Sequence, residues 1–202
     1  MTIWLGSQPL VLASQSYARQ MLLQNAGIPF EAIPAAIDER GVQQASGLTS
    51  PAEIAARLAE EKALAVSQRL PGRLVLGADQ TLALGERTFN KPADRAKATA
   101  QLRTLSGRRH ELHSAIALVR NGKTVFAETS VARMTMRQLT EAEIEAYLNE
   151  AGDAATSSVG GYQVEGLGVH LFDGIHGDHF TILGLPLVPL LNYLRQQRLL
   201  AF

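Results

Sequence analysis

The stretch Leu74-Val75-Leu76-Gly77-Ala78-Asp79 places a carboxylate directly after an apolar run. A short apolar run bounded by polar residues is typical of a buried strand, so this run predicts a strand that ends at Asp79. Open α/β sheets bind their ligands at the carboxyl ends of their strands. We therefore expect Asp79 to bind a metal or to accept a proton from an attacking water. The alternative is an aspartate that caps a turn.

The first half of the chain alternates between strand and helix patterns around that run. Two more segments, at residues 10–13 and 30–33, predict strands, the first of them buried. Helical spacing and capping residues predict helices after Arg19, from Pro51 onward, and over residues 94–105. Such an alternation is typical of parallel βαβ units.

The second half has a different pattern. Asn121-Gly122 separates two strand-like segments, residues 112–119 and 124–136, and this is the strongest short signal for a β-hairpin. Three later segments predict a helix, a short strand and a final helix, at residues 140–147, 168–172 and 187–195. The two halves together predict an α/β fold with a mixed, twisted sheet and flanking helices. We expect a single domain over residues 1–202, with no linker between independent parts.

The composition excludes several classes of protein. The 202 residues include 19 basic and 19 acidic side chains and no cysteine, so disulfides and cysteine-ligated zinc are excluded. Balanced charge and few aromatic residues, with no stacking pattern, argue against a nucleic-acid-binding module. No apolar run approaches membrane-spanning length, and the segment from Met1 lacks a signal-peptide pattern. We expect a cytoplasmic protein with no membrane or nucleic-acid partner.

A possible anion site lies at the start of the first predicted helix. Ser14 and Ser16 fall near its N-terminus, where free backbone N–H groups favour an anion. Arg19 lies in the first turn, and its guanidinium matches a phosphate with two hydrogen bonds. Taken alone, a simple helix cap with a solvated arginine is the better interpretation.

Other charged residues add to this pattern. Asp38 and Glu39 follow an apolar residue, Lys62 lies in a helical stretch, and Lys91 lies in a turn before a proline. Each of these residues is a weak signal alone. Acids and bases that converge on one place suit a metal-bound polyphosphate, because the phosphates need cations and the metal needs carboxylates.

Eight short motifs, in a defined order and spacing, carry a resemblance to a known family. They are LASQSYARQMLL (12–23), IDER (37–40), RLAEEKA (57–63), GADQT (77–81), NKP (90–92), LSGRRH (105–110), GYQVEGLG (161–168) and GLPL (184–187). In this order the chain resembles the Maf family of nucleoside triphosphate pyrophosphatases over nearly its whole length. The resemblance implies an inosine-triphosphate-pyrophosphatase-like fold with two lobes around a cleft. It also implies hydrolysis between the α and β phosphates, and a homodimer.

The resemblance assigns roles by matching position. Asp79 is the catalytic carboxylate that accepts a proton and also a metal ligand, and Glu39 is the metal-associated glutamate. The implied metal is a divalent cation, usually Mg²⁺, with Mn²⁺ or Co²⁺ as alternatives. The implied phosphate-binding residues are Ser14, Arg19, Lys62 and Lys91.

The chain departs from the family pattern at several of these positions. Ala18 replaces a phosphate-binding arginine, and Ser157 and Ser158 replace an acid and a lysine. Arg108 and Arg109 are candidates to supply the missing cation. These losses leave a second interpretation open, in which the protein is a nucleotide-binding regulator of cell division with little catalysis.

Three positions bear on the choice of base: Ala18, Gln80 and Glu165. Gln80 and Glu165 resemble the subgroup associated with 7-methyl-GTP. A carboxylate at Glu165 would accept hydrogen bonds from the N1–H and N2 amine of guanine, and would favour the positive charge of a methylated purine.

Overall fold

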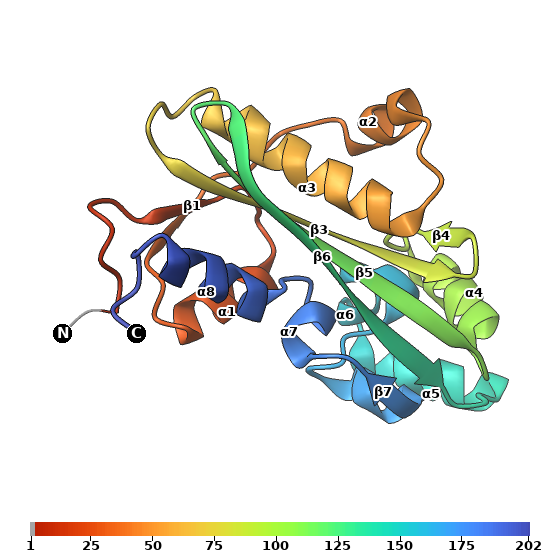
Figure 1. Ribbon diagram of the computed structural model, residues 1–202. Coiled ribbons are helices and arrows are strands. Elements are labelled where there is room, and N and C mark those ends of the chain that lie inside the picture. The colour runs from red at the N-terminus through yellow and green to blue at the C-terminus, as the bar shows by residue number, and fades with distance from the viewer. Residues whose placement is uncertain (1–2) are drawn as a thin grey trace.

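The computed structural model describes residues 3–202. Met1 and Thr2 lie outside the described residues. They begin the segment that was predicted to lack a signal peptide. A seven-stranded mixed sheet forms the centre of the structure, with helices on both faces (Figure 1). The strand order is β2-β1-β3-β5-β6-β7, and β4 pairs with β3. The predicted α/β fold with a mixed sheet is therefore confirmed.

The strands are β1 (Leu10–Leu12), β2 (Phe30–Ala32), β3 (Leu74–Leu84), β4 (Arg87–Phe89), β5 (Arg109–Arg120), β6 (Lys123–Met136) and β7 (Phe172–His176). The α-helices are α1 (Tyr17–Asn25), α2 (Glu39–Ser46), α3 (Pro51–Ser67), α4 (Arg95–Leu105), α5 (Glu141–Ala151), α6 (Ala154–Ser157), α7 (His179–Ile182) and α8 (Leu187–Gln196). Two 3₁₀ helices, η1 (Val159–Gly161) and η2 (Leu167–Leu171), precede β7. No helix within residues 3–202 combines the length and hydropathy needed to cross a membrane.

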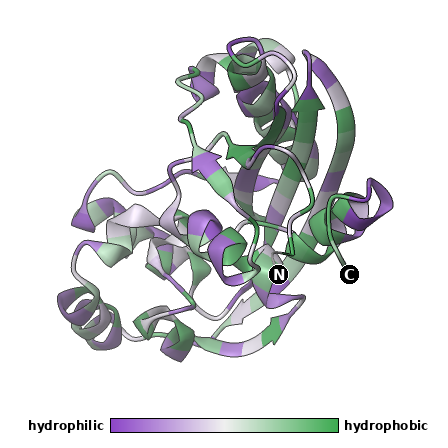
Figure 2. Ribbon diagram, turned by 90° about the vertical axis from the view of Figure 1, so that its left-hand side faces the viewer, coloured by the Kyte–Doolittle hydropathy of each residue, from purple (hydrophilic) through white to green (hydrophobic). Residues whose placement is uncertain are grey.

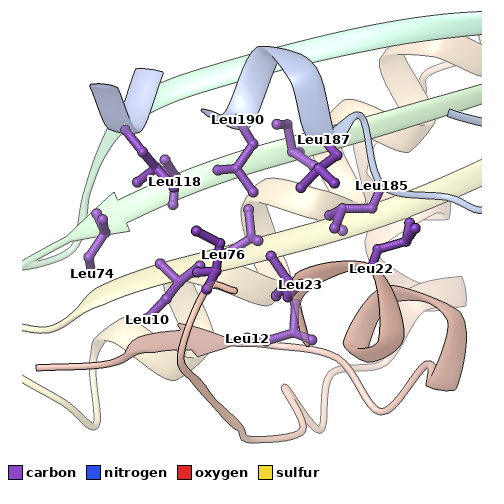
Figure 3. Packing of buried hydrophobic residues seen from close by; sticks show 14 of the residues in the cluster. Leu10, Leu12, Leu22, Leu23, Leu74, Leu76, Leu118, Leu185, Leu187 and Leu190 are labelled. Atoms are coloured by element: carbon purple, nitrogen blue, oxygen red, sulfur yellow. The ribbon is translucent and has the colours of Figure 1, made fainter. Parts of the chain in front are cut away.

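Alternating residues of the central strands pack on opposite faces of the sheet. Leu74 and Leu76 of β3 join the leucines of β1, α1 and α8 in one buried cluster, where these side chains point toward one another (Figure 3). Val75, between them, packs with Val66 of α3 on the other face. This period of two is the strand periodicity. The strands carry many hydrophobic residues, with hydrophilic ones between them, and hydrophilic residues also occur on loops and helices (Figure 2).

Strand β3 runs through two separate hydrophobic clusters. Leu74 and Leu76 lie in the cluster with α1 and α8, whereas Leu82 lies in a second cluster with α4 and α5. Figure 1 shows the two helical groups at opposite ends of the long central strands. Two packed groups joined by shared strands fit the predicted arrangement of two lobes.

One edge of β3 is uncovered in the middle. Parallel pairing with β1 ends at Leu76, and antiparallel pairing with β4 begins only at Leu82. The other edge pairs with β5 without a break from Leu74 to Ala83. Asp79 lies within the uncovered stretch, between the two lobes.

The position of Asp79 corrects the sequence prediction. Strand β3 does not end at Asp79 but continues to Leu84. The continued ladder with β5 supplies the backbone hydrogen bonds that extend the strand past the charged residue. What ends near Asp79 is the parallel partner β1, so the site lies beside a gap in the sheet.

Other predicted elements have a mixed outcome. The hairpin is confirmed, with Asn121 and Gly122 both at positive φ, as a type I′ turn requires. The short strand predicted over residues 168–172 is wrong: most of that segment is the 3₁₀ helix η2, and β7 begins at Phe172. The two acids at Asp38 and Glu39 begin helix α2, which the sequence reasoning missed.

Candidate active site

A cavity of about 670 Å³ opens beside the uncovered edge of β3. Residues from α1, α2, α3, the turn after β4, and the segments around η1 and α7 line it. The predicted site residues that line this cavity are Ala18, Arg19, Glu39, Lys62, Asp79, Gln80, Lys91 and Glu165. Ser14 is the exception, and it joins the site through a hydrogen bond from Arg19. Neither Arg108 nor Arg109 lines the cavity, so the structure does not place a replacement cation there from this pair.

Helix α3 lies directly on β3 because Gly77 has no side chain. A Cβ at Gly77 would lie 2.0 Å from the backbone oxygen of Ala59 and 2.8 Å from the nitrogen of Ala63. Real Cβ atoms do not approach backbone so closely, so any other residue would push the helix away. Lys62 therefore lies close above the strand, on the face toward which Asp79 also projects.

The centre of the site is one ammonium group held by two carboxylates. The Nζ atom of Lys62 lies 2.6 Å from Oδ1 of Asp79 and 2.8 Å from Oε1 of Glu39. Only 11% of the Lys62 side chain and 10% of the Asp79 side chain are exposed, compared with 52% for Glu39. A buried charge needs an opposite charge or hydrogen bonds. Lys62 and Asp79 satisfy this requirement for each other.

Arg19 is partly buried and ties several segments together. Its Nε donates to the carbonyl oxygen of Gly184 at 2.8 Å, and its Nη1 donates to Ala78 O at 2.8 Å and Ser14 Oγ at 3.2 Å. Burial lowers the pKa of Arg19, whereas the charges of Asp79 and Glu39 raise it. Within residues 3–202, the Nη2 group has no hydrogen-bond partner, which leaves it free to bind an anion.

Gln80 lies on the opposite face of β3 from Asp79. Its Nε2 donates to Ser114 Oγ at 2.8 Å, and to the carbonyl oxygens of Thr181 at 3.1 Å and Ile182 at 3.0 Å. The amide nitrogen of Gln80 is thus committed to holding α7 against the sheet. Only its carbonyl oxygen is left to face a ligand.

Glu165 lines the cavity from the segment that follows η1. Three contacts anchor η1 and Tyr162 next to it: Tyr147 donates to Gly161 O at 3.2 Å, Gly160 N donates to Gln101 Oε1 at 2.9 Å, and His110 Nε2 bonds with Tyr162 OH at 2.6 Å. Burial, together with the nearby Glu165 charge, raises the pKa of Tyr147 to about 12. The tyrosine therefore stays protonated and can keep donating at neutral pH.

The sequence patterns did not predict these three contacts. Tyr162 and Gln163 line the cavity, and His110 is buried behind Tyr162. The signal was present in the GYQVEGLG and LSGRRH motifs. Nothing in their spacing shows that a histidine 52 positions before Tyr162 bonds to it.

The donor set fits a hard divalent cation. The two carboxylates already share one cation, the ammonium of Lys62, and oxygen ligands suit magnesium. Residues 3–202 contain no cluster of three or more histidine, cysteine, aspartate or glutamate side chains that could hold a metal. Glu39 and Asp79 could therefore hold such an ion only together with other ligands, such as phosphate oxygens and water.

Several known proteins are similar to this chain over nearly its whole length. A protein of Rhodopseudomonas palustris (strain HaA2) named nucleoside triphosphate pyrophosphatase is 76% identical over 202 residues, all of both chains. A protein of the same name from Nitrobacter winogradskyi is 66% identical over 201 residues, 100% of both chains. One from Brucella abortus biovar 1, named 7-methyl-GTP pyrophosphatase, is 52% identical over 192 residues, 94% of this chain and 96% of that protein.

Likeness to solved structures is much weaker. A HAM1 protein from Coxiella burnetii shares 21% identity with a TM-score of 0.41, over 63% of this chain and 72% of that one. A likeness at this level supports no conclusion about fold or function. The sequence comparison is stronger, because the model of the Maf-like protein family matches residues 9–197. The chain belongs to the Maf family.

Proposed function

We propose that this protein hydrolyses nucleoside triphosphates between the α and β phosphates, giving a nucleoside monophosphate and pyrophosphate. The observation that carries the proposal is the Lys62 ammonium between Asp79 and Glu39, in a cavity that Arg19 and Lys91 also line. Relatives that are 66% and 76% identical bear the name of this activity.

The residues of the site fit the steps of this reaction. The oxygen of a water attacks the α phosphorus, the bond from that phosphorus to the α–β bridging oxygen breaks, and pyrophosphate leaves. Asp79 accepts the proton of the water: its Oδ1 is bonded to Lys62, whereas Oδ2 has no hydrogen-bond partner within the described chain. Such a positioned base typically contributes about 10²–10⁴-fold to the rate.

The cations of the cavity offset the charge of the triphosphate. Nη2 of Arg19, together with Lys62 and Lys91, would face the phosphates and stabilise the negative charge on the departing pyrophosphate. A divalent cation, proposed as Mg²⁺ with Mn²⁺ or Co²⁺ as substitutes, would be held by Glu39 and Asp79 and would polarise the phosphate oxygens.

We also propose a preference for a methylated guanine base. Glu165 and Ala18 line the cavity, and a carboxylate can accept hydrogen bonds from N1–H and N2 of guanine. A relative that is 52% identical is named 7-methyl-GTP pyrophosphatase. The homodimer is a proposal that rests on the family resemblance alone, and the cytoplasmic location is a proposal that rests on the sequence patterns alone.

The experiment is pyrophosphate release from dTTP, UTP, CTP, GTP and 7-methyl-GTP with Mg²⁺, with Asp79→Asn as the control. We expect turnover that favours 7-methyl-GTP and falls at least about 10²-fold in Asp79→Asn. Turnover spread over pyrimidines would keep the enzyme and reject the base preference. A folded protein with no turnover on any of the five would favour the regulatory binder.

A further inference from the structure

Lys62 occupies the position of a cation between two acidic side chains. Its Nζ lies within hydrogen-bonding distance of Asp79 Oδ1 and Glu39 Oε1, the two carboxylates that the proposed function assigns to a divalent metal. The Lys62 ammonium therefore already offsets the negative charge of the carboxylates that would attract such an ion. Any metal at these carboxylates has to share them with the ammonium or displace it.

The local charge gives no net attraction for a free metal ion. Asp79 and Glu39 carry two negative charges, and Lys62 and Arg19 carry two positive ones. Arg19 is close enough for both carboxylates to raise its pKa. The four groups are thus neutral together, and the other charged residues that line the cavity also cancel: Arg40 and Lys91 against Asp38 and Glu165. A metal–triphosphate complex is itself negative, so it complements the cations where a bare divalent ion does not.

Moving the Lys62 ammonium away from the two carboxylates is energetically unfavourable unless another partner replaces them. The ammonium is nearly enclosed, and within the described chain it forms ion pairs with the two carboxylates. A buried ammonium that loses its partners bears a large desolvation penalty. Phosphate oxygens can replace the carboxylates as partners of the ammonium. They also complete the coordination of an ion with only two protein ligands.

We propose that Lys62 competes with the metal for Asp79 and Glu39, so that the metal binds with the nucleotide rather than before it. Lys62 holds the carboxylates together in the free protein. On binding, it turns toward the phosphates as the ion takes its place. This inference rests on the proposed function, because that function supplies the metal and the triphosphate.

The test measures binding and needs no turnover. Mn²⁺ is titrated calorimetrically into the nucleotide-free protein, as wild type and as Lys62→Gln. We expect Lys62→Gln to bind Mn²⁺ at least about tenfold more tightly, because a competing charge has been removed. The gain should disappear in Lys62→Gln/Asp79→Asn. Equal Mn²⁺ affinity in wild type and Lys62→Gln would overturn the proposal.

Lys91→Gln is the matched control, since Lys91 lines the same cavity but forms no ion pair with a described residue. We expect its nucleotide-free Mn²⁺ affinity to change by less than about twofold, since its charge is more exposed to solvent. A gain equal to that of Lys62→Gln would show a general effect of cavity charge and would reject direct competition.

A second measurement uses the wild type alone and does not depend on the folding of a variant. The wild type should bind the complex of Mn²⁺ with α,β-methylene GTP at least about tenfold more tightly than Mn²⁺ alone. Equal affinities would overturn the proposed order of binding. Both results are separable from the proposed function, because a protein without pyrophosphatase activity can show the competition and an active enzyme can lack it.

Discussion

The guanidinium of Arg19 donates a hydrogen bond of 2.8 Å to the carbonyl oxygen of Ala78, next to Asp79. That carbonyl lies in the stretch of β3 where β1 has ended and β4 has not begun. Arg19 thus takes the place of a missing strand partner. The same residue lines the ligand cavity, so one side chain both completes the sheet and presents a cation to the site.

Arg19→Lys should lower the stability of the fold as well as its activity. A lysine cannot reproduce the bonds that Nε and Nη1 make to Gly184, Ala78 and Ser14. The free energy of unfolding should fall by about 2 kcal/mol or more, measured by urea denaturation. Arg40→Lys is the control, because Arg40 lines the cavity without a hydrogen bond to a described residue. Equal stability of the two variants would contradict the structural role of Arg19.

Gly77→Ala should separate α3 from β3. The new methyl group would meet the backbone of Ala59, so we expect a loss of about 1–3 kcal/mol in unfolding free energy. Turnover should also fall, because Lys62 moves with the helix. Gly174→Ala is the matched control, with no atom nearer than 3.9 Å to the added carbon. A Gly77→Ala protein with wild-type stability and turnover would show that this close packing does not position Lys62.

Glu165→Gln should change the ranking of substrates rather than the chemistry. An amide presents a donor where the carboxylate has only acceptors, so the preference for 7-methyl-GTP over dTTP should fall by about tenfold in kcat/KM. Kinetics with both substrates checks this, and Glu150→Gln on the exposed surface of α5 serves as the control. An unchanged ranking would mean that Glu165 does not read the base.

Stability should decline as the solution becomes acidic. Burial lowers the pKa of His110 from 6.5 to about 4, so the unfolded chain binds a proton more readily than the folded one. The stabilisation is fully present above pH 6.5 and is lost as pH falls toward 4.

Urea denaturation at two pH values checks the prediction for His110. Between about pH 7 and pH 5 the wild type should lose about 2 kcal/mol from this residue. His110→Gln, whose amide can still bond to Tyr162, should show a correspondingly weaker dependence on pH. A mutant with the same pH dependence as the wild type would assign the effect to other groups, such as His113, whose pKa burial also lowers.

Sequence patterns predicted the framework well where local chemistry determines structure. Asn121-Gly122 specified the hairpin, and Thr140 with Glu143 forms a capping box at the start of α5. The end of β3 was mispredicted at Asp79, because a charged residue usually closes an apolar run. Pairing between distant segments, here β3 with β5, outweighs that local signal.

The candidate site could be predicted only in part. Motif resemblance named Glu39, Lys62 and Asp79, but spacing along the chain could not show that one ammonium bonds both carboxylates. Likewise, Gln80 was expected to read the base, whereas its amide nitrogen bonds Ser114 and the carbonyls of α7. These contacts join residues that are distant in the sequence, and only the tertiary packing of the folded chain brings such residues together.

Hydrolysis in ¹⁸O-labelled water, with the products analysed by mass spectrometry, tests the proposed reaction most directly. We expect the label to enter the nucleoside monophosphate and the pyrophosphate to leave unlabelled, because water attacks the α phosphorus. Label in the pyrophosphate, or release of inorganic phosphate as the first product, would contradict it.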